Sequence, residues 1–254
     1  MYMSNVAIEV VGLTKRYDDK TVVDNISFQV KQGEVFGILG PNGAGKTTTL
    51  EMIEAIRPID DGKVILNGIN VADNPTQIRQ IIGVQPQSPA FQDKNKLTEL
   101  LELFAAAYGE KVDAKKFLAD VDLEEKANSY IEQLSGGQKQ RFSIAAALVH
   151  NPKVFFMDEP TTGLDPQARR NLWDLVQQIQ KKGITIVMTT HYMEEAEILC
   201  DRVAIMDNGK IITIDSPKNL VKQLLKKGFK KSQHVEQANL EDVFIDLTGK
   251  KLKD

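Results

Sequence analysis

Apolar and polar residues alternate along the first part of the chain in the way that β-strands require. The segments are short and rich in valine, isoleucine and phenylalanine: 6–13 (VAIEVVGL), 25–30 (NISFQV), 35–40 (VFGILG) and 63–68 (KVILNG). Such residues are typical of strands because β-branched and aromatic side chains pack well on a pleated surface. The pattern therefore predicts that the chain opens with several strands.

The periodicity becomes helical between about residue 91 and residue 150. Residues 96–109 (KLTELLELFAAAYG) are rich in leucine and alanine, and their apolar positions fit one face of an amphipathic helix. Two short segments follow around residues 117–123 (FLADVDL), and a long helix is predicted to begin near Gly136.

Strands and helices alternate in the remainder of the chain. Residues 154–157 (VFFM) form a short apolar run between a proline and an aspartate, as expected of a buried parallel strand. A helix at 169–182, a strand at 185–190, another helix and a strand at 202–207 follow. Alternating strands and helices indicate an α/β fold with a parallel sheet, into which the helical stretch is inserted.

These changes in pattern predict three parts of the chain. Residues 1–87 and 152–217 would form a core with its β-rich part, and residues 88–151 a helical insertion. Residues 218–254 would be a short C-terminal extension with nine lysines against five acidic residues. Its cluster at 226–231 (KKGFKK) could approach anionic lipid headgroups, although most charge runs are solvated helix faces, which is the favoured explanation here.

Composition narrows the class of protein further. The 254 residues are 42% hydrophobic and 26% charged, as in an ordinary globular protein, and the net charge of −3 does not suggest a nucleic-acid binder. The single cysteine, Cys200, excludes an internal disulfide framework and is interpreted as an apolar filler in the helix MEEAEILC. No signal-peptide pattern or membrane-spanning apolar run is visible, which favours a location inside the cell.

The segment GPNGAGKTT at residues 40–48, called the phosphate loop below, fits the pattern G-x-x-x-x-G-K-[ST]. A predicted strand precedes it and a predicted helix follows it, so its backbone N–H groups can surround phosphates. Lys46 would reach the β- and γ-phosphates, and the Thr47 hydroxyl would bind Mg²⁺. A glycine-rich turn without a ligand would not account for this order of strand, lysine, hydroxyl and helix. The candidate nucleotide contacts are Gly40, Pro41, Asn42, Gly43, Ala44, Gly45, Lys46, Thr47 and Thr48.

Two neighbouring carboxylates end the predicted strand at 154–158. Asp158 lies where open α/β sheets bind ligands and suits Mg²⁺, which takes few protein ligands. Glu159 follows it and points differently, so it is the candidate general base for an attacking water. An acidic strand end without chemistry is the alternative, and the nearby phosphate loop argues against it.

A Gly-Gly turn in LSGGQKQR at residues 134–141 precedes the long helix and could direct backbone N–H groups at another anion. A phosphate loop, LSGGQ, and an MDEP strand end 23 residues later resemble the ATP-binding cassette (ABC) ATPases. The resemblance extends from about Val6 to about Asp215. It implies a P-loop NTPase core with a mixed, mainly parallel sheet, an antiparallel N-terminal β-subdomain and an inserted helical subdomain.

The resemblance also assigns roles to other residues. Gln87 resembles the glutamine that links core and helical insert and contacts the metal, and it is preferred over Gln85 because it follows a proline. His191 resembles the switch histidine that contacts the γ-phosphate. Asp165 resembles the aspartate-loop residue, and Tyr17 the aromatic that stacks on adenine, with plain packing as the alternative for the tyrosine.

In this family the LSGGQ turn of one subunit closes over ATP held by the phosphate loop of another. The resemblance therefore implies that Ser135, Gly136, Gly137 and Gln138 contact the nucleotide of a partner chain. The implied activity is hydrolysis of ATP with Mg²⁺ in a head-to-tail dimer, formed by two copies or by related chains. The dimer would power a separate membrane permease from the cytoplasmic face of the cell membrane.

The permease would dock between the core and the helical insert. Ala90, Phe91, Leu97 and Leu101 are placed for such docking, although a core role for the leucines is an equal alternative. Residues 239–252 (NLEDVFIDLTGKKL) resemble a segment of ATPases paired with drug-export permeases, which favours export. Only 18 residues separate Leu220 from Asn239, fewer than in many relatives, so this part of the chain departs from the pattern of that subgroup.

Non-transport functions fit the chain less well. ABC ATPases that act on chromosomes carry long coiled-coil insertions before LSGGQ, for which this chain has no room, and those that act on ribosomes usually fuse two cassettes. A GTPase would have Asn-Lys-x-Asp after a core strand, but NKLT at 95–98 lacks the aspartate. No nucleic-acid partner is therefore expected.

Overall fold

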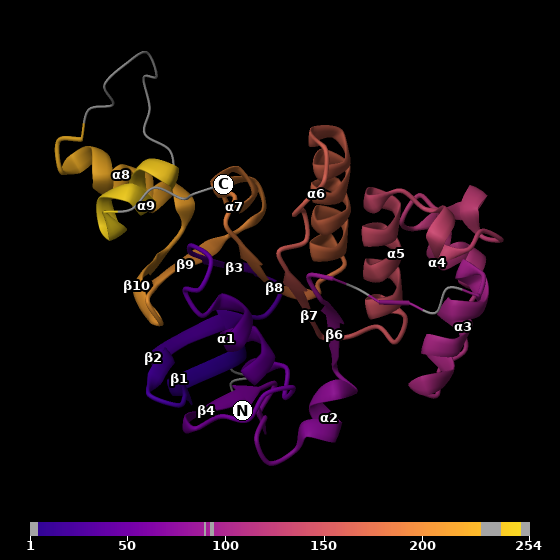
Figure 1. Ribbon diagram of the computed structural model, residues 1–254, viewed down its shortest axis with the longest axis horizontal. Coiled ribbons are helices and arrows are strands. Elements are labelled where there is room, and N and C mark those ends of the chain that lie inside the picture. Colours follow the sequence, from indigo (N-terminus) through magenta and orange to yellow (C-terminus); the bar gives the residue numbers. More distant parts are fainter. Residues whose placement is uncertain (1–4, 89, 92–93, 230–239, 250–254) are drawn as a thin grey trace.

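The computed structural model describes residues 5–88, 90–91, 94–229 and 240–249, which build two sheets and the helices around them (Figure 1). The smaller sheet is antiparallel throughout. Its strands lie in the order β2-β1-β4-β5, with bounds β1 (Val6–Tyr17), β2 (Lys20–Lys31), β4 (Asp61–Leu66) and β5 (Ile69–Asn70).

The larger sheet is mixed and mainly parallel. Its order is β10-β9-β3-β8-β7-β6, and only β10 runs antiparallel to its neighbour. Because the other strands are parallel, their carboxyl ends meet at one edge of the sheet. The bounds are β3 (Val35–Leu39), β6 (Ile82–Gln85), β7 (Val154–Asp158), β8 (Thr185–Thr190), β9 (Arg202–Asp207) and β10 (Lys210–Asp215).

Helix α1 (Lys46–Ile53) joins the two sheets into one core. Its buried residues Leu50, Met52 and Ile53 share a hydrophobic cluster with residues of both sheets, such as Ile8 of β1 and Phe36 of β3. Helix α2 (Pro75–Arg79) packs near β6 at the margin of this cluster. The beginning of α1 is thereby fixed at the carboxyl edge of the larger sheet.

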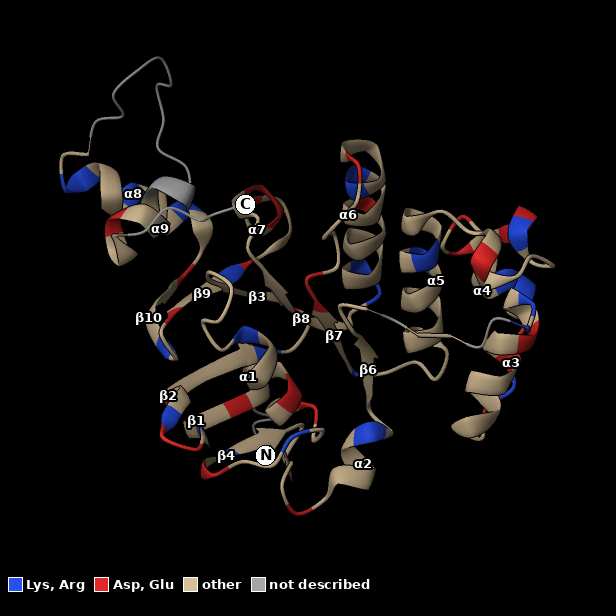
Figure 2. Ribbon diagram, viewed as in Figure 1, with Lys and Arg blue, Asp and Glu red and all other residues tan. Residues whose placement is uncertain are grey.

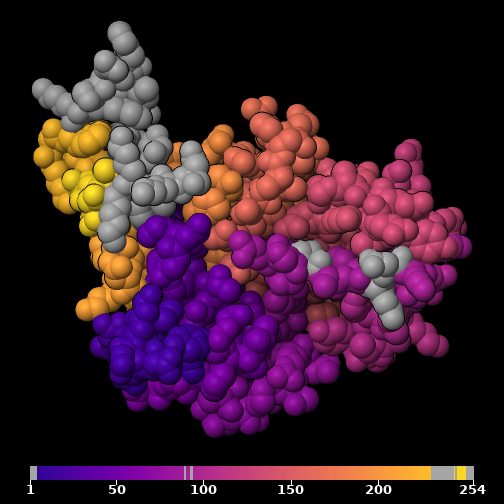
Figure 3. All heavy atoms as spheres, viewed as in Figure 1, coloured from indigo at the N-terminus to yellow at the C-terminus, as the bar shows by residue number. Residues whose placement is uncertain are grey.

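The other face of the larger sheet is covered by helices. A second hydrophobic cluster joins this face to α6 (Pro166–Lys181), α7 (Met193–Leu199) and the helical segment, which comprises α3 (Leu97–Ala107), α4 (Ala114–Ala119), two 3₁₀ turns (Glu124–Lys126 and Ile131–Gln133) and α5 (Gly136–Leu148). Figure 3 shows this segment, in magenta and pink, as a lobe on one side of the indigo N-terminal sheet. The fold class predicted from the sequence is confirmed.

The C-terminal helices α8 (Pro217–Lys226) and α9 (Leu240–Thr248) pack against each other and against α7, on the side away from α3 (Figure 1). An ion pair of 3.5 Å between Lys227 Nζ and Asp246 Oδ2 links the two helices. The remaining lysines of α8, Lys218, Lys222 and Lys226, are exposed. Figure 2 shows Lys and Arg positions of this helix in blue. The other lysines of the lysine-rich extension, at 230, 231, 250, 251 and 253, lie outside the described residues.

Three details differ from the predictions. Gly136 and Gly137 are the first two residues of α5 and not a turn ahead of it, because the side chain of Ser135 caps the helix directly before them. Cys200 follows α7 in extended conformation instead of ending a helix, although it is buried as expected. Leu97 and Leu101 are fully buried core residues, so they cannot contribute to a docking surface.

The close contact between β6 and α5, where the helical segment joins the core, can be tested by adding a side chain at Gly83. A Cβ atom at Gly83 would lie 2.3 Å from the carbonyl oxygen of Ala147 on α5, so Gly83→Ala forces the two elements apart. We expect the free energy of unfolding in urea to fall by about 1–3 kcal/mol, as for other overpacked sites. Gly136→Ala is the matched control, because its Cβ meets only Leu164 Cδ2 at 3.9 Å. Equal stability of the two variants would contradict the tight β6–α5 contact.

Candidate functional site

The phosphate loop follows β3 at the carboxyl edge of the larger sheet, and its path depends on glycine. Gly43 and Gly45 have φ angles of 81° and 103°, which side chains disfavour. A Cβ atom at Gly40 would lie 2.2 Å from the carbonyl oxygen of Met206, so this position has no room for a side chain. The glycines thus allow the loop to turn sharply between β3 and α1.

The loop presents a row of free backbone donors. Within the described part of the chain, the N–H groups of Gly45, Lys46, Thr47 and Thr48 donate no hydrogen bond, since the first turn of a helix has no internal acceptor. The loop is held from behind, where the Gly209 N–H donates to the Ala44 carbonyl at 3.0 Å. Free N–H groups and the positive end of the α1 dipole together suit a phosphate group.

Lys46 places its ammonium group inside the loop. Its Nζ donates to the carbonyl oxygens of Gly40 at 2.9 Å and Pro41 at 3.3 Å, and it lies 3.2 Å from Glu159 Oε1. Only 4% of the Lys46 side chain and 8% of the Glu159 side chain are exposed. A buried positive charge at this point offers phosphate oxygens a strong partner.

Thr47 and Asp158 meet where the resemblance places a metal. The Thr47 hydroxyl donates to Asp158 Oδ2 at 2.9 Å, and the Thr189 hydroxyl donates to Asp158 Oδ1. One carboxylate and one hydroxyl are ligands that fit Mg²⁺, which completes its coordination with water and phosphate oxygens. Groups of three or more His, Cys, Asp or Glu side chains that could hold a metal alone are not found among the described residues. The donor set therefore fits a metal that arrives with a nucleotide.

Glu159 is the residue on which most side chains of the site converge. Its backbone adopts a left-handed conformation with φ of 47°, and its N–H donates to Thr189 Oγ1 at 3.0 Å. The carboxylate Oε2 accepts hydrogen bonds from Gln87 Nε2 and Thr162 Oγ1, both at 3.3 Å. The same oxygen lies 3.2 Å from His191 Nδ1. The unusual φ turns Glu159 away from the strand axis that Asp158 follows.

These neighbours keep Glu159 ionised. The imidazole of His191 and the ammonium of Lys46 lower the pKa of Glu159 from 4.5 to about 2, against the opposing effect of burial. Both groups favour the charged carboxylate because they lie on its two oxygens. At neutral pH, Glu159 is therefore a carboxylate that can accept a hydrogen bond from water.

The glutamine chosen from the sequence is the one at the site. Gln87 contacts Glu159, whereas Gln85 is completely buried at the end of β6 and donates to the Pro86 carbonyl at 2.7 Å. Gln87 was also a candidate metal ligand, but its amide contacts Glu159 and makes no hydrogen bond with Thr47 or Asp158 within the described residues.

The candidate residues of the LSGGQ segment, Ser135 to Gln138, form the beginning of helix α5. The Ser135 hydroxyl accepts a hydrogen bond from the Gln138 N–H at 3.3 Å, and the Ser135 N–H donates to Gln138 Oε1 at 3.0 Å. A Cβ at Gly137 would lie 3.1 Å from Ala168 Cβ, which places the beginning of α5 against that of α6. Across the described ranges, no hydrogen bond or ion pair joins residues 135–138 to the phosphate loop of the same chain.

Asp165 and Tyr17 lie at the surface. Asp165 caps α6, because its Oδ1 accepts from the N–H groups of Gln167 and Ala168 at 3.0 and 2.9 Å. The ring of Tyr17 is 38% exposed at the end of β1, and its hydroxyl accepts a hydrogen bond from Arg57. Lys15 Nζ lies 5.5 Å from the ring centroid. Arg57 Cζ also lies 5.5 Å from the ring centroid, so two cationic side chains surround the partly exposed ring.

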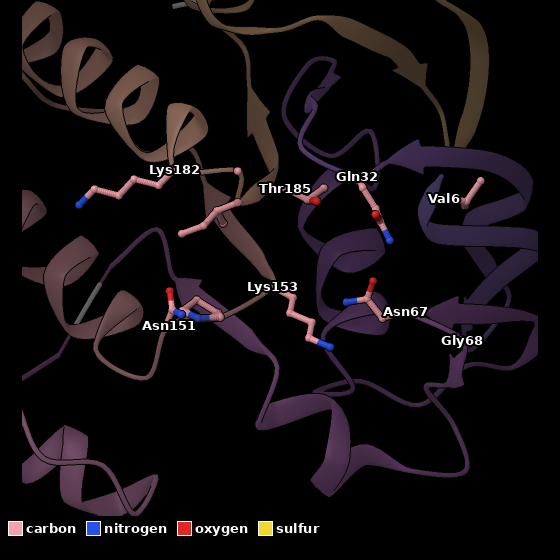
Figure 4. A pocket seen from close by; sticks show the side chains of 11 residues that line it. Val6, Gln32, Asn67, Gly68, Asn151, Lys153, Lys182 and Thr185 are labelled. Atoms are coloured by element: carbon pink, nitrogen blue, oxygen red, sulfur yellow. The ribbon is translucent and has the colours of Figure 1, made fainter. Parts of the chain in front are cut away.

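Hollows also lie outside this site. A cavity of about 620 Å³ lies at the opposite, amino edge of the sheet, where Lys153 precedes β7 and Thr185 begins β8 (Figure 4). A second hollow of about 340 Å³, called the groove below, lies between the core and the helical segment. It is lined by Glu54, Ile56, Arg79, Ile82, Gly83, Val84, Pro86, Ala90, Phe91, Phe104, Tyr108, Ser143, Ala146, Ala147 and His150.

Thr189 and Thr162 are parts of the site that the sequence did not reveal. Thr189 fixes both Asp158 and the backbone of Glu159, and Thr162 contacts the carboxylate of Glu159. The only signal for Thr189 is its place at the carboxyl end of a buried strand. Threonine is frequent in strands for packing reasons alone, so that signal is weak.

Comparisons with known proteins agree with this geometry. Residues 23–162 match the model of the family described as "ABC transporter". The chain is 41% identical to the linearmycin resistance ATP-binding protein LnrL of Bacillus subtilis, over 85% of this chain and 71% of that protein. It is 44% identical to the Nod factor export ATP-binding protein I of Burkholderia pseudomallei, over 86% of this chain and 74% of that protein.

Solved structures show the same fold. A structure described as the ATP binding subunit of an ABC transporter superposes with a TM-score of 0.82 at 30% identity, over 95% of this chain and 99% of that one. The cbiO1 protein of Clostridium perfringens, described as part of the ABC transporter complex cbiONQ, gives a TM-score of 0.77 at 29% identity, over 88% and 94%. In the described part of this chain, no helix has the length and apolar character needed to cross a membrane.

The contacts of Glu159 predict how its ionisation responds to mutation. His191 has the largest effect in lowering the pKa of Glu159, so His191→Ala should raise that pKa from about 2 toward 4.5. Lys46→Ala should raise it as well, because the ammonium group also favours the ionised carboxylate. The measurement is a ¹³C NMR titration of the Glu159 carboxyl in the nucleotide-free chain.

The same shift has a consequence for stability. Because the folded pKa of Glu159 lies below its usual 4.5, the ionised group stabilises the folded chain above about pH 4.5. This contribution is lost as the pH falls toward 2. The contacts of Glu159 with His191 and Lys46 would be contradicted if its carboxyl titrated with a midpoint near pH 4.5 in the unmodified chain and His191→Ala did not change that midpoint.

Proposed function

Because the chain belongs to the ABC transporter family, as one of its ATP-hydrolysing subunits, we propose that it works in a head-to-tail dimer and drives a separate membrane subunit. The main support for the proposal is that the candidate nucleotide-binding residues of one chain form two separate groups. The phosphate loop, Asp158, Glu159 and His191 converge at one sheet edge, while Ser135–Gln138 begin a helix with no bond to them. A second chain would supply the missing half.

In the proposed site, ATP lies on the phosphate loop with its β- and γ-phosphates toward Lys46. The loop N–H groups and Lys46 would neutralise the phosphate charge, and the exposed ring of Tyr17 would stack on adenine. Mg²⁺, held by Thr47 and Asp158 together with phosphate oxygens and reached by Gln87, would add further neutralising charge. From the partner, the residues equivalent to Ser135, Gly136, Gly137, Gln138 and Asp165 would close over the γ-phosphate.

Glu159 would then orient the attacking water. In the nucleotide-free chain its carboxylate is occupied by Lys46, His191 and Gln87. A bound γ-phosphate would attract Lys46 and His191, since both are hydrogen-bond donors to anions. Glu159 would thereby lose the contacts that lower its pKa and become a better proton acceptor at the time when water must be activated.

The groove is the proposed docking place for the membrane subunit. Ala90 and Phe91 line it together with Phe104 of α3, and Gln87 lies directly beside the same segment. The segment that forms one wall of the groove therefore also reaches Glu159. A short helix in the groove could respond to changes at the nucleotide site through this connection.

We further propose that residues 1–87 and 152–217 act as the core, residues 88–151 as the helical part and residues 218–254 as a C-terminal extension. The name of the Nod factor export ATP-binding protein I supports export as the direction of transport. The chain would work at the cytoplasmic face of the cell membrane, held by its membrane subunit. Action on ribosomes or nucleic acid is the alternative function.

Replacing the proposed base tests the chemistry. Glu159→Gln should keep ATP binding, because the phosphate loop is intact, and slow hydrolysis by about 10²- to 10⁴-fold, as for other lost general bases. Phosphate release and binding of a fluorescent ATP analogue measure the two effects separately. Glu125→Gln, at an exposed position of the helical segment, is the matched control and should hydrolyse ATP normally.

Lys46→Ala should show the complementary result, with a loss of ATP affinity. If Glu159→Gln turns over at the unmodified rate, Glu159 is not the base. If Lys46→Ala binds ATP unchanged, the phosphate loop is not the nucleotide site.

Purification of the trapped complex tests the transport function. The Glu159→Gln chain is tagged and purified with Mg-ATP from solubilised membranes of its own cell. We expect a membrane protein with several membrane-spanning segments to co-purify with it in near-equimolar amount. Mass spectrometry identifies that protein. Recovery of ribosomes or DNA without a membrane partner would leave the ATPase standing and reject transport.

A further inference from the structure

Glu54 is a buried carboxylic acid at the groove, and no part of the proposed ATPase mechanism uses it. It follows the last residue of α1 as the C-terminal cap of that helix, and it belongs to the lining of the groove. Only 4% of the residue is exposed, an unusual degree of burial for glutamate.

The carboxyl group of Glu54 has no partner within the described residues, where no hydrogen bond or ion pair reaches it. Two neighbouring polar side chains of the groove contact backbone carbonyls instead, and His150 Nδ1 is a further buried atom without a hydrogen-bond partner among the described residues. Arg79 Nη2 donates to the Ala55 carbonyl at 3.4 Å, and His150 Nε2 contacts the Ile82 carbonyl at 2.9 Å. A buried and unpartnered polar side chain costs stability, so its presence at a binding surface suggests a partner that arrives with the ligand.

Three features make the surroundings of Glu54 favourable for a positive charge. Burial and, to a smaller extent, the carboxylates of Asp158 and Glu51, which repel a negative charge there, together raise the pKa of Glu54 to about 8. Glu54 also lies at the end of α1 where the helix dipole is negative. A cation would be attracted by Asp158, by Glu51 and by the helix dipole, and it would favour the ionised form of Glu54, which burial alone disfavours.

We propose that Glu54 binds a lysine or arginine side chain of the membrane-subunit helix that occupies the groove. The remaining walls, with Phe91, Phe104 and Ala146, accept the apolar face of the same helix. The occupant is thus an amphipathic helix with one basic residue on its docking face. This inference rests on the proposed function, because it names the chemistry by which that membrane subunit is recognised.

The position of Glu54 gives the contact a direct connection to ATP. Helix α1 begins with Lys46 and Thr47 at the phosphate loop and ends at Glu54 in the groove, with its middle packed between the two sheets. A basic side chain on Glu54 is therefore bound to the same rigid helix that holds the nucleotide.

The docked segment can be identified through a single new thiol. Cys200 is the only cysteine of the chain and is buried, so Ala146→Cys adds one reactive thiol at the groove. A photoactivatable maleimide on that thiol, in the complex purified through Glu159→Gln, should label one cytoplasmic segment of the membrane subunit. Peptide mass spectrometry should find a lysine or arginine within that segment.

The recognition itself is tested by paired changes. Glu54→Gln should weaken binding of the purified membrane subunit by at least roughly 30-fold, as expected for one half of a buried charge pair. Replacing the identified basic residue by glutamine, with the ATPase unchanged, should weaken it equally. Combining the two variants should cause little further loss. Glu102→Gln, at an exposed position of α3, is the matched control and should bind as the unmodified chain does.

Each outcome decides the proposal. Normal binding by Glu54→Gln, normal binding after the change in the membrane subunit, or a labelled segment without lysine or arginine would overturn it while leaving the transport function intact. If Glu54→Gln fails to bind a fluorescent ATP analogue, its fold is damaged and the change in the membrane subunit alone decides. Failure to recover any membrane protein with the unmodified Glu54 would reject the proposed function and this inference together.

Discussion

The nucleotide site depends on one buried ion pair, between Lys46 of the phosphate loop and Glu159 at the end of β7. Removing two charges from water is costly unless further hydrogen bonds satisfy them, and both partners have such bonds. Lys46 is held by two loop carbonyls, and Glu159 by Gln87, Thr162 and His191. Because phosphate and Glu159 compete for Lys46, ATP binding necessarily changes the surroundings of the proposed base.

Parallel pairing makes this competition possible. Strand β8 lies between β3 and β7, so the phosphate loop, Asp158 and His191 all leave the sheet at one edge. Helix α1 begins at the phosphate loop, and Glu54, which follows its last residue, lies in the groove. In the proposed function, the nucleotide and the membrane subunit would therefore bind at opposite ends of one short helix.

Much of this arrangement could be predicted from the sequence, because the chemistry lies in contiguous motifs. Residues 40–48 contain their own strand end, turn and helix start, and Asp158 and Glu159 end a recognisable apolar run. Strands β6 and β10 and helix α2 were not predicted, since they are short or only partly buried and their signals are weak. For Leu97 and Leu101 the sequence left docking and core roles open, and their burial, which depends on helices distant in sequence, decides for the core.

Contacts between side chains from distant segments of the sequence were the hardest feature to predict. Thr189 is one threonine among several in strands, and only the pairing of β7 with β8 brings it to Asp158 and Glu159. Glu54 reads in the sequence as an ordinary charged helix residue. Its isolation in the groove results from packing between α1, β6 and the helical segment, which no local pattern specifies.

The central claim is that one chain holds half of each working site, and sedimentation velocity of the Glu159→Gln chain tests it most directly. With Mg-ATP the account predicts a dimer, and with Mg-ADP a monomer. Adding Gly136→Asp should prevent the dimer, since the position has room for a side chain within its own chain but would place a carboxylate against the partner's nucleotide. A Glu159→Gln chain that binds Mg-ATP yet stays monomeric, or a dimer unaffected by Gly136→Asp, would contradict the account.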